Sequence, residues 1–277
     1  MTFDQLFTTV PDWLIWAGAI AVTSCLAAAA VVLHRLRWGL PVIESVPQQP
    51  VPWDGGDVLL VLISYVAAAT LAATTLGRQL TLQASLAANV LINAAVTLIT
   101  TAWLIQRGAC RADLGVPSLR LRRSLGLAVV GLALVLAPLL AMAAALNAIV
   151  TYDHPVVALL GAERDPWSVI VVVLAAVVAA PVAEEFFFRR ILLGWLDKRF
   201  PSRGGTVAIT ASAAAFALAH QGQGLAYLPL FPLGIVLGFM AHRTGSIVPC
   251  ILLHALFNAV SVGLLLADPG LTAAGSS

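Results

Sequence analysis

The chain has 277 residues, of which 60% are hydrophobic and 10% charged, and its mean hydropathy is +0.96. These values exclude an ordinary soluble domain and predict an integral membrane protein. The net charge of +2 gives no reason to expect nucleic acid as a partner, and the three scattered cysteines predict neither a disulfide framework nor a cysteine metal site.

A membrane-spanning helix needs about 20 apolar residues, and the sequence offers eight candidate stretches. Five long ones cover roughly 13–33, 58–76, 84–105, 125–150 and 167–188. Three shorter or glycine-broken stretches follow at about 206–220, 225–241 and 247–267. The expected fold is therefore all-α, a polytopic protein of about eight transmembrane helices embedded in a lipid bilayer.

Charged residues around these stretches predict the orientation of the chain. Asp12 precedes the first stretch whereas Arg35 and Arg37 follow it, which is the reverse of a cleaved secretory signal. With eight spans, an outside N-terminus places 13 of the 15 Lys and Arg residues on the cytoplasmic side, all except Arg78 and Arg164. This asymmetry is the positive-inside pattern. We expect both termini to lie outside a membrane of the bacterial cytoplasmic type.

Composition also predicts an organisation in three parts. Residues 1–123 contain three helices without ionisable groups at their apolar centres, together with cytoplasmic linkers. Residues 124–267 form a block in which ionisable groups recur inside apolar stretches. Residues 268–277 are expected to be a disordered tail. The first part is therefore interpreted as accessory and the second as the functional core.

The first group of charges within an apolar stretch lies in PVAEEFFFRRIL, residues 181–192. The apolar pattern continues to Trp195, so Glu184 lies about 16 Å from that helix end, near the middle of the membrane. Glu185 and Arg189 are four residues apart and share a helical face, where they can form an ion pair. Glu184 points away from that pair and is left to act as a general base. The alternative is an ion-pair latch between helices without chemistry.

Two further motifs place histidines inside apolar helices. FALAH has Phe216 and His220 four residues apart, and HALFN has His254 and Asn258 at the same spacing. A histidine and an amide on one face can direct two donors at one point, as an oxyanion site requires. Taken singly, these residues also suit packing or an interhelical hydrogen bond. In straight parallel helices, His220 would lie about 21 Å and His254 about 12 Å from the start of its helix, which places them at different depths. Helix tilt, or an earlier start of the first of these helices, would bring them together.

The motifs EExxxR, FxxxH and HxxxN occur in this order over roughly residues 165–264. As a set they resemble the CPBP family of intramembrane proteases, which includes CAAX prenyl endopeptidases of the Rce1 type and bacterial Abi proteins. The resemblance implies a multi-helix membrane hydrolase that cleaves membrane-tethered peptides or proteins with a water molecule activated by Glu and His. The first three helices carry no such resemblance.

Residue by residue, the resemblance implies that Glu184 is the general base and that His220 positions the water. It implies that His254 and Asn258 stabilise the oxyanion. The supporting residues that it implies are Glu185, Arg189 and Phe216.

Members of the family have been described as metalloproteases and as metal-independent glutamate proteases. The sequence has no HExxH helix, so we favour a site without a metal or other cofactor. If Zn²⁺ or another divalent ion binds, Glu184, His220 and His254 are its expected ligands. A proton-coupled transporter would use the same residue types, although no inverted repeat is evident. A non-catalytic membrane scaffold or immunity-type protein of the same fold is the other alternative.

Overall fold

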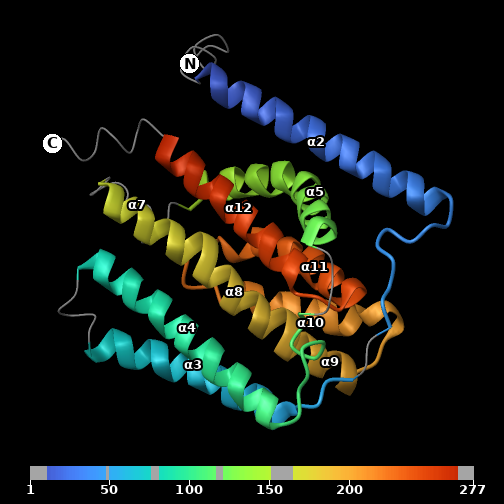
Figure 1. Cartoon of the computed structure of the whole chain (residues 1–277). Coiled ribbons are helices and arrows are strands. Elements are labelled where there is room, and N and C mark those ends of the chain that lie inside the picture. Colours follow the sequence, from blue (N-terminus) through green and yellow to red (C-terminus); the bar gives the residue numbers. More distant parts are fainter. Residues whose placement is uncertain (1–10, 48–49, 76–80, 117–120, 151–164, 268–277) are drawn as a thin grey trace.

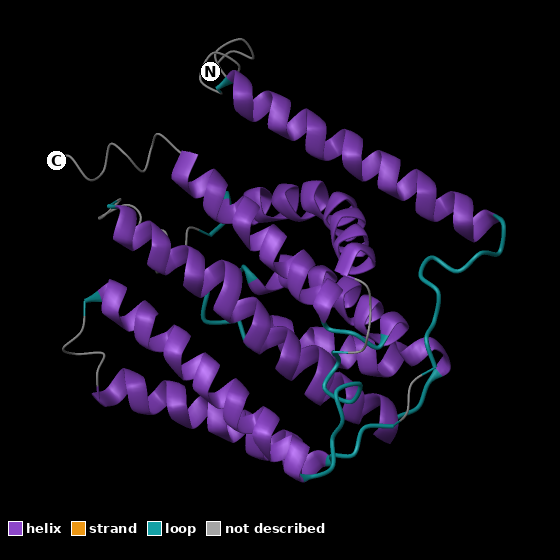
Figure 2. Ribbon diagram, viewed as in Figure 1, coloured by secondary structure: helices purple, strands orange, loops and turns teal. Residues whose placement is uncertain are grey.

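A computed structural model describes residues 11–47, 50–75, 81–116, 121–150 and 165–267. Within these ranges every regular element is a helix and the connections are loops and turns (Figure 2). This confirms the predicted all-α fold. The predicted disordered tail, residues 268–277, lies outside the described residues.

The described helices form eight rods, one for each predicted stretch. The first four rods are α2 (Asp12–Arg37), α3 (Gly55–Thr75), α4 (Leu82–Gln106) and α5 (Leu121–Asn147). The fifth rod is continuous and consists of α7 (Pro166–Val173), η1 (Leu174–Ala179), α8 (Ala180–Glu184), η2 (Glu185–Leu192) and α9 (Leu193–Arg199). After a short turn, η3 (Arg203–Gly205), come α10 (Thr206–Leu218), α11 (Tyr227–Thr244) and α12 (Val248–Ala267).

Six of these rods are long and apolar enough to cross a membrane: α2, α3, α4, α5, the fifth rod and α12. The protein is therefore a polytopic integral membrane protein. Helix α10 has only 13 residues, about 20 Å of rise, and it packs along α11. That length is less than the roughly 30 Å of a hydrocarbon core. The short α10 belongs to the protein core and does not reach both membrane surfaces by itself.

The fifth rod lies between two groups of helices (Figure 1). On one side α3 and α4 pair with each other, and α4 packs on α7, η1 and α8. On the other side α12 packs on η1 and α8 and also on α5, whose outer side carries α2 (Figure 1). The start of α2, the start of α7 and the end of α12 lie at one end of the bundle (Figure 1). This arrangement surrounds the fifth rod with neighbours.

The start of the fifth rod is fixed by residues suited to a helix N-terminus. The Asp165 carboxylate accepts hydrogen bonds from the backbone N–H groups of Trp167 and Ser168 at 2.9 and 3.3 Å, and Pro166 occupies the first turn. The Ser168 hydroxyl also donates a hydrogen bond to this carboxylate. The pKa of Asp165 is lowered because this bond and the backbone donors favour the charged form. The rod then runs 34 residues to Arg199, which confirms the predicted continuation past Phe188 to Trp195.

Two segments of the rod, η1 and η2, are wound as π-helix. A π-helix bonds each N–H five residues back, and such segments are rare and often mark functional sites. Side chains from elsewhere donate to carbonyl groups in both segments: Asn258 to Ala176 at 2.7 Å, Ser212 to Phe188 at 2.6 Å, and Trp53 to Ile191 at 3.0 Å. The unusual winding is therefore tied to three different parts of the fold.

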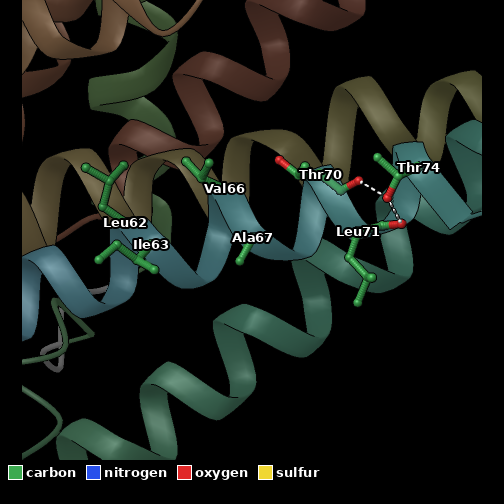
Figure 3. A pocket seen from close by; sticks show the side chains of 7 residues that line it. All are labelled: Leu62, Ile63, Val66, Ala67, Thr70, Leu71 and Thr74. Carbon is green, nitrogen blue, oxygen red and sulfur yellow. Dashed lines mark hydrogen bonds between the residues drawn. The ribbon is translucent and has the colours of Figure 1, made fainter.

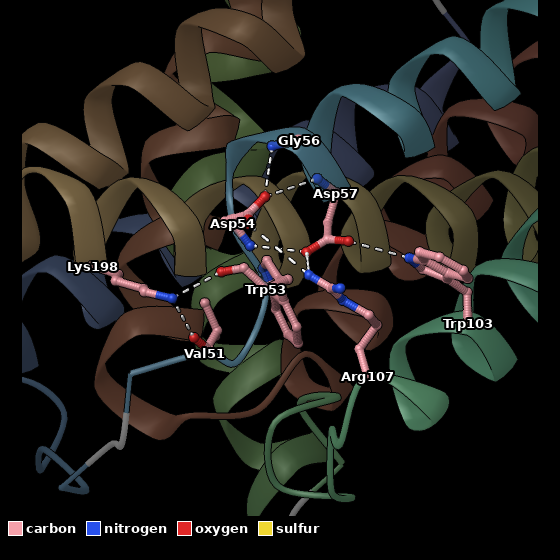
Figure 4. Close-up of polar contacts among 8 residues, drawn as sticks. All are labelled: Val51, Trp53, Asp54, Gly56, Asp57, Trp103, Arg107 and Lys198. Atoms are coloured by element: carbon pink, nitrogen blue, oxygen red, sulfur yellow. Dashed lines mark hydrogen bonds and ion pairs between the residues drawn. The ribbon is translucent and has the colours of Figure 1, made fainter.

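The loop before α3 holds the other end of the rod (Figure 4). The Trp53 side chain is fully buried, and the Lys198 ammonium donates to the carbonyls of Val51 and Trp53, each at 3.0 Å. A Cβ atom on Gly194 would lie 2.8 Å from the Val51 side chain, so glycine permits this close approach. The loop thus docks on α9 and η2.

A carboxylate near the start of α3 links this loop to α4 (Figure 4). Asp57 is buried, and it accepts hydrogen bonds from the Trp103 indole and the Arg107 guanidinium, each at 3.3 Å. The neighbouring Asp54 has a lowered pKa because the backbone N–H groups of Asp57 and Gly56 donate to its carboxylate. These contacts fix α3 and α4 relative to each other at one end of the bundle.

Helix α3 turns an apolar face outward (Figure 3). Leu62, Ile63, Val66 and Leu71 line a shallow hollow of about 570 Å³ there, and all four are exposed. The Thr74 hydroxyl on this face donates to the carbonyls of Thr70 and Leu71 in its own helix, at 2.9 and 3.1 Å. A hydroxyl satisfied within its own helix suits a surface that faces lipid. The hollow contains none of the motif residues.

Close packing of α5 against α12 leads to a stability prediction. A Cβ atom on Gly131 would lie 2.4 Å from Cδ1 of Leu253 and 3.1 Å from Cε of Met240, and both side chains are buried. We expect Gly131→Ala to destabilise the protein by about 1 to 3 kcal/mol through overpacking. Thermal unfolding in detergent measures this effect.

Gly126 on the same helix is the matched control, because no atom lies within 4 Å of an added Cβ there. Gly126→Ala should be neutral or stabilising by about 0.5 to 1 kcal/mol, since alanine is the better helix former. Equal melting temperatures for the two variants would show that the contact between α5 and α12 is not close-packed in the protein.

Candidate active site

The centre of the site is the Glu185 carboxylate at the start of η2, which is fully buried. Its Oε1 accepts a hydrogen bond from Nδ1 of His254 at 2.9 Å, and its Oε2 lies 3.2 Å from Nε of Arg189. The predicted ion pair between Glu185 and Arg189 is therefore present. It also includes a histidine from α12, so the two carboxylate oxygens contact two different partners.

The Arg189 side chain is buried and packs on aromatic faces. Its guanidinium carbon lies 4.4 Å from the centre of the Phe216 ring and 5.8 Å from that of Phe188. No nitrogen of this guanidinium has a hydrogen bond of good geometry within the described part of the chain. The charge is offset by Glu185 and by the electron-rich faces of the two rings. Phe216 therefore contacts Arg189, which its spacing from His220 alone does not indicate.

The hydrogen bonds of the two histidines indicate which nitrogen carries the proton. A carbonyl or carboxylate oxygen only accepts, so Nδ1 of His254 donates to Glu185, and Nδ1 of His220 donates to the Phe216 carbonyl at 2.8 Å. In the neutral form of each ring, Nε2 then carries the lone pair. Both Nε2 atoms lie 3.8 Å from the Glu184 carboxylate, one near each oxygen.

Glu184 is thus surrounded by acceptor groups. The 3.8 Å separations exceed the length of a direct hydrogen bond. When both rings are neutral, two imidazole lone pairs and a carboxylate face one another. The Glu184 side chain is 25% exposed, whereas Glu185 beside it is 0% exposed. A small molecule that donates protons, such as water, fits this set of acceptors. Glu184 is therefore the more exposed of the two carboxylates.

These residues do not form a ready metal site. Among the described residues, no group of three or more His, Cys, Asp or Glu side chains is arranged to hold a metal ion, and Glu184, His220 and His254 are included in that statement. The Nε2 atoms of His220 and His254 each lie 3.8 Å from a Glu184 carboxylate oxygen. We therefore derive no reaction step through a metal.

Asn258 bonds to the fifth rod. Its amide Nδ2 donates to the Ala176 carbonyl in η1 at 2.7 Å. That carbonyl is available because the N–H of Ala180 bonds to Ala175, and Pro181 has no N–H to donate. The interhelical hydrogen bond foreseen as an alternative is present. It uses one of the two amide protons, so the second proton is left for another acceptor.

The structure brings Glu184, Glu185, Arg189, Phe216, His220 and His254 into one cluster. The expected difference in depth between the histidines does not arise, because both contact Glu184. His220 lies just beyond α10, which ends at Leu218, whereas His254 lies within α12. The two helices therefore contact the fifth rod at different distances from their own starts, and both histidines reach Glu184.

Two side chains near the site were not selected from the sequence. Ser212 donates to the Phe188 carbonyl inside the site helix. Tyr65 on α3 packs its ring against Phe187, with ring centres 6.0 Å apart. Tyr65 could have been noticed as a single tyrosine in the middle of an apolar stretch. Nothing in the sequence around Ser212 indicates its contact. Helix α3, which lies outside the predicted functional core, therefore contacts the helix that carries the site.

The fold and the cluster define a polytopic helical membrane protein with an ionisable site buried among its helices. Residues 166–260 match the family of type II CAAX prenyl endopeptidase Rce1-like proteins. The match covers all three motifs and supports the family that they predict, so this region of the chain is similar to Rce1-like proteins. Comparison with curated proteins and with solved structures gave no significant match.

Proposed function

We propose that this protein is an intramembrane endopeptidase in which Glu184 activates a water molecule to hydrolyse a peptide bond. The observation that carries the proposal is the convergence of the Nε2 atoms of His220 and His254 on the partly exposed Glu184 side chain, whose Oε2 is buried without a hydrogen-bond partner among the described residues. The match to a family of CAAX prenyl endopeptidases supports the same reaction class. The proposed substrate is a membrane-tethered peptide or protein.

In the proposed reaction, the Glu184 carboxylate takes a proton from water while the water oxygen bonds to the scissile carbonyl carbon. The Nε2 lone pair of His220 accepts the second water O–H and so positions the attack. The carbon–nitrogen bond then breaks, and Glu184 passes its proton to the leaving amine. The products are a carboxylic acid, which keeps the second water proton, and an amine.

Charge develops on the carbonyl oxygen during the attack, and we propose that His254 and Asn258 stabilise it. This role requires a proton on Nε2 of His254. The Glu185 carboxylate, 2.9 Å from Nδ1, supports the positive ring that results. The second amide proton of Asn258 is the other donor. Arg189 balances the Glu185 charge and holds it in place.

A cleavage assay with purified protein in liposomes tests the proposal. The probes are synthetic peptides with an apolar segment of about 20 residues and variable flanking sequences, each assayed with and without a chelator. The proposal expects cleavage of a subset of peptides by the wild type. Absence of cleavage across the whole set would favour a non-catalytic scaffold. Loss of cleavage with chelator would instead show a requirement for a metal.

We also propose that the basic loops face the cytoplasm and that both termini lie outside. Cys110 in the loop after α4 is exposed, whereas Cys250 is buried and Cys25 is partly buried. In a Cys25→Ala background, an impermeant thiol reagent should label Cys110 in inside-out vesicles and not in right-side-out vesicles. A Cys110→Ser variant controls for other reactive groups. Labelling from the outer face alone would reverse the proposed topology.

A further inference from the structure

Helix α4 carries polar side chains at every fourth position, which places them on one face. These residues are Asn89, Asn93, Thr97 and Thr101. Asn93 donates from Nδ2 to Oδ1 of Asn89 at 2.7 Å, and the Thr101 hydroxyl donates to the Thr97 carbonyl at 2.7 Å. We call Asn89, Asn93 and Thr97 the polar stripe. Such residues within a membrane span mark functional sites or contacts between helices.

The polar stripe is turned towards the protein. Val96 and Thr100 on α4 are buried, and they lie three and seven residues after Asn93, on the same face. Helix α4 packs on α7, η1 and α8 as well as on α3. Asn89 is nevertheless exposed, and Asn93 and Thr97 are only partly buried. The stripe therefore borders the fifth rod and is still accessible.

Tyr65 on α3 connects the polar stripe to the active site. Its hydroxyl lies 2.7 Å from Oγ1 of Thr97, and its ring packs on Phe187. The stripe and Tyr65 thus extend from the N-terminal half of α4 to Phe187, three residues after the proposed general base. Both lie outside residues 166–260, so the family match does not include them.

Hydrolysis of a peptide inside a membrane requires side chains that can hydrogen-bond the peptide backbone. A peptide bond in a helix is shielded by the helix itself, so the substrate must unwind locally before water attacks its carbonyl. Unwinding exposes backbone N–H and C=O groups, and hydrocarbon offers them no partners. The bond between Asn93 and Asn89 leaves a second N–H on Asn93 and both N–H groups of Asn89 for other acceptors.

We propose that the polar stripe and Tyr65 form the substrate-binding edge, where they hydrogen-bond the unwound main chain of a membrane-tethered peptide beside Glu184. This proposal rests on the proposed endopeptidase function. The occupant is a peptide backbone, because alternating amide donors and carbonyl acceptors match the mixed donors and acceptors of asparagine, threonine and tyrosine.

The first test separates binding from structure through the kinetics of cleaved peptides. Asn93→Leu and Thr97→Val should each raise KM about tenfold with kcat unchanged, the signature of lost substrate binding. Thr74→Val makes the same change as Thr97→Val on the outer face of α3 and should alter neither constant. Ser168→Ala removes the 2.6 Å hydrogen bond from Gln83 that joins α7 to α4, so it should lower the melting temperature without raising KM.

A lower melting temperature for Asn93→Leu with an unchanged KM would overturn the proposal, because the stripe would then only join helices. A fall in kcat alone would also overturn it, since the stripe would act in the chemistry.

A second test does not depend on turnover. Glu184→Gln protein carrying p-benzoylphenylalanine in place of Asn93 is irradiated with the biotinylated peptide set in liposomes. The control carries the same photoreactive group in place of Ile63, on the outer face of α3. We expect peptide to cross-link at position 93 in clear excess over position 63. Equal cross-linking yields at the two positions, or no cross-linking at position 93, would overturn the binding edge. Cross-linking at position 93 without cleavage by the wild type would leave this edge in place and refute the endopeptidase function.

Discussion

Glu184→Gln is expected to abolish peptide hydrolysis, with a loss of about 10²- to 10⁴-fold in rate. The amide has nearly the same shape as the carboxylate, so it leaves no cavity in the site. It cannot accept a proton from water, and the general base is therefore lost. The measurement is the initial rate of cleavage of a responsive peptide by purified protein in liposomes.

Two controls accompany this variant. Its melting temperature should match that of the wild type, because Glu184 has no short ion pair to lose, with both histidine nitrogens 3.8 Å away. Glu44→Gln makes the same change in an exposed ion pair with Arg123 and should leave the rate unchanged. If Glu184→Gln kept more than about a tenth of the wild-type rate, another group would have to be the base, since acid–base catalysis contributes at least about 10²-fold.

Arg189→Ala is expected to reduce the free energy of unfolding by about 3 to 5 kcal/mol. Both members of its ion pair with Glu185 are fully buried, so the substitution leaves a buried carboxylate without its cationic partner. The aromatic contacts of the guanidinium with Phe216 and Phe188 are lost as well. The measurements are folded yield after membrane extraction and thermal or denaturant unfolding in detergent.

Arg123→Ala is the matched control, because Arg123 pairs with Glu44 at 3.6 Å where both side chains are exposed. Exposed pairs contribute only about 0 to 1 kcal/mol, so this variant should be close to the wild type. An Arg189→Ala protein that is inactive but as stable as Arg123→Ala would contradict the structural role of the buried pair and place Arg189 in the chemistry.

The helices could be predicted because apolar length is read directly from the sequence. The continuation of the fifth rod to Trp195 followed from the apolar residues after the arginines, and the spacing of four residues correctly paired Glu185 with Arg189. Both inferences depend on interactions within one helix. Periodicity and length contain that information, so no knowledge of the neighbouring helices was needed.

The partners of the histidines and of Asn258 could not be predicted in the same way. Contacts such as that between Nδ1 of His254 and Glu185 depend on how separate helices pack. The π-helical winding of η1 and η2 has no periodic signal, yet it frees the carbonyl that Asn258 binds. Tyr65 was missed because a lone tyrosine in an apolar helix has many possible roles. Its position beside the site emerges only from the packing of α3 against η2.

The central claim is that a water molecule activated by Glu184 attacks the peptide bond directly. Mass spectrometry of a single-turnover reaction in H₂¹⁸O, with protein in excess over a responsive peptide, tests this claim most directly. The account predicts that the new carboxyl group of the product carries ¹⁸O and that the mass of the intact protein stays unchanged throughout turnover. A protein mass increased by that of the N-terminal peptide fragment would show a covalent acyl-enzyme and would contradict direct attack by water.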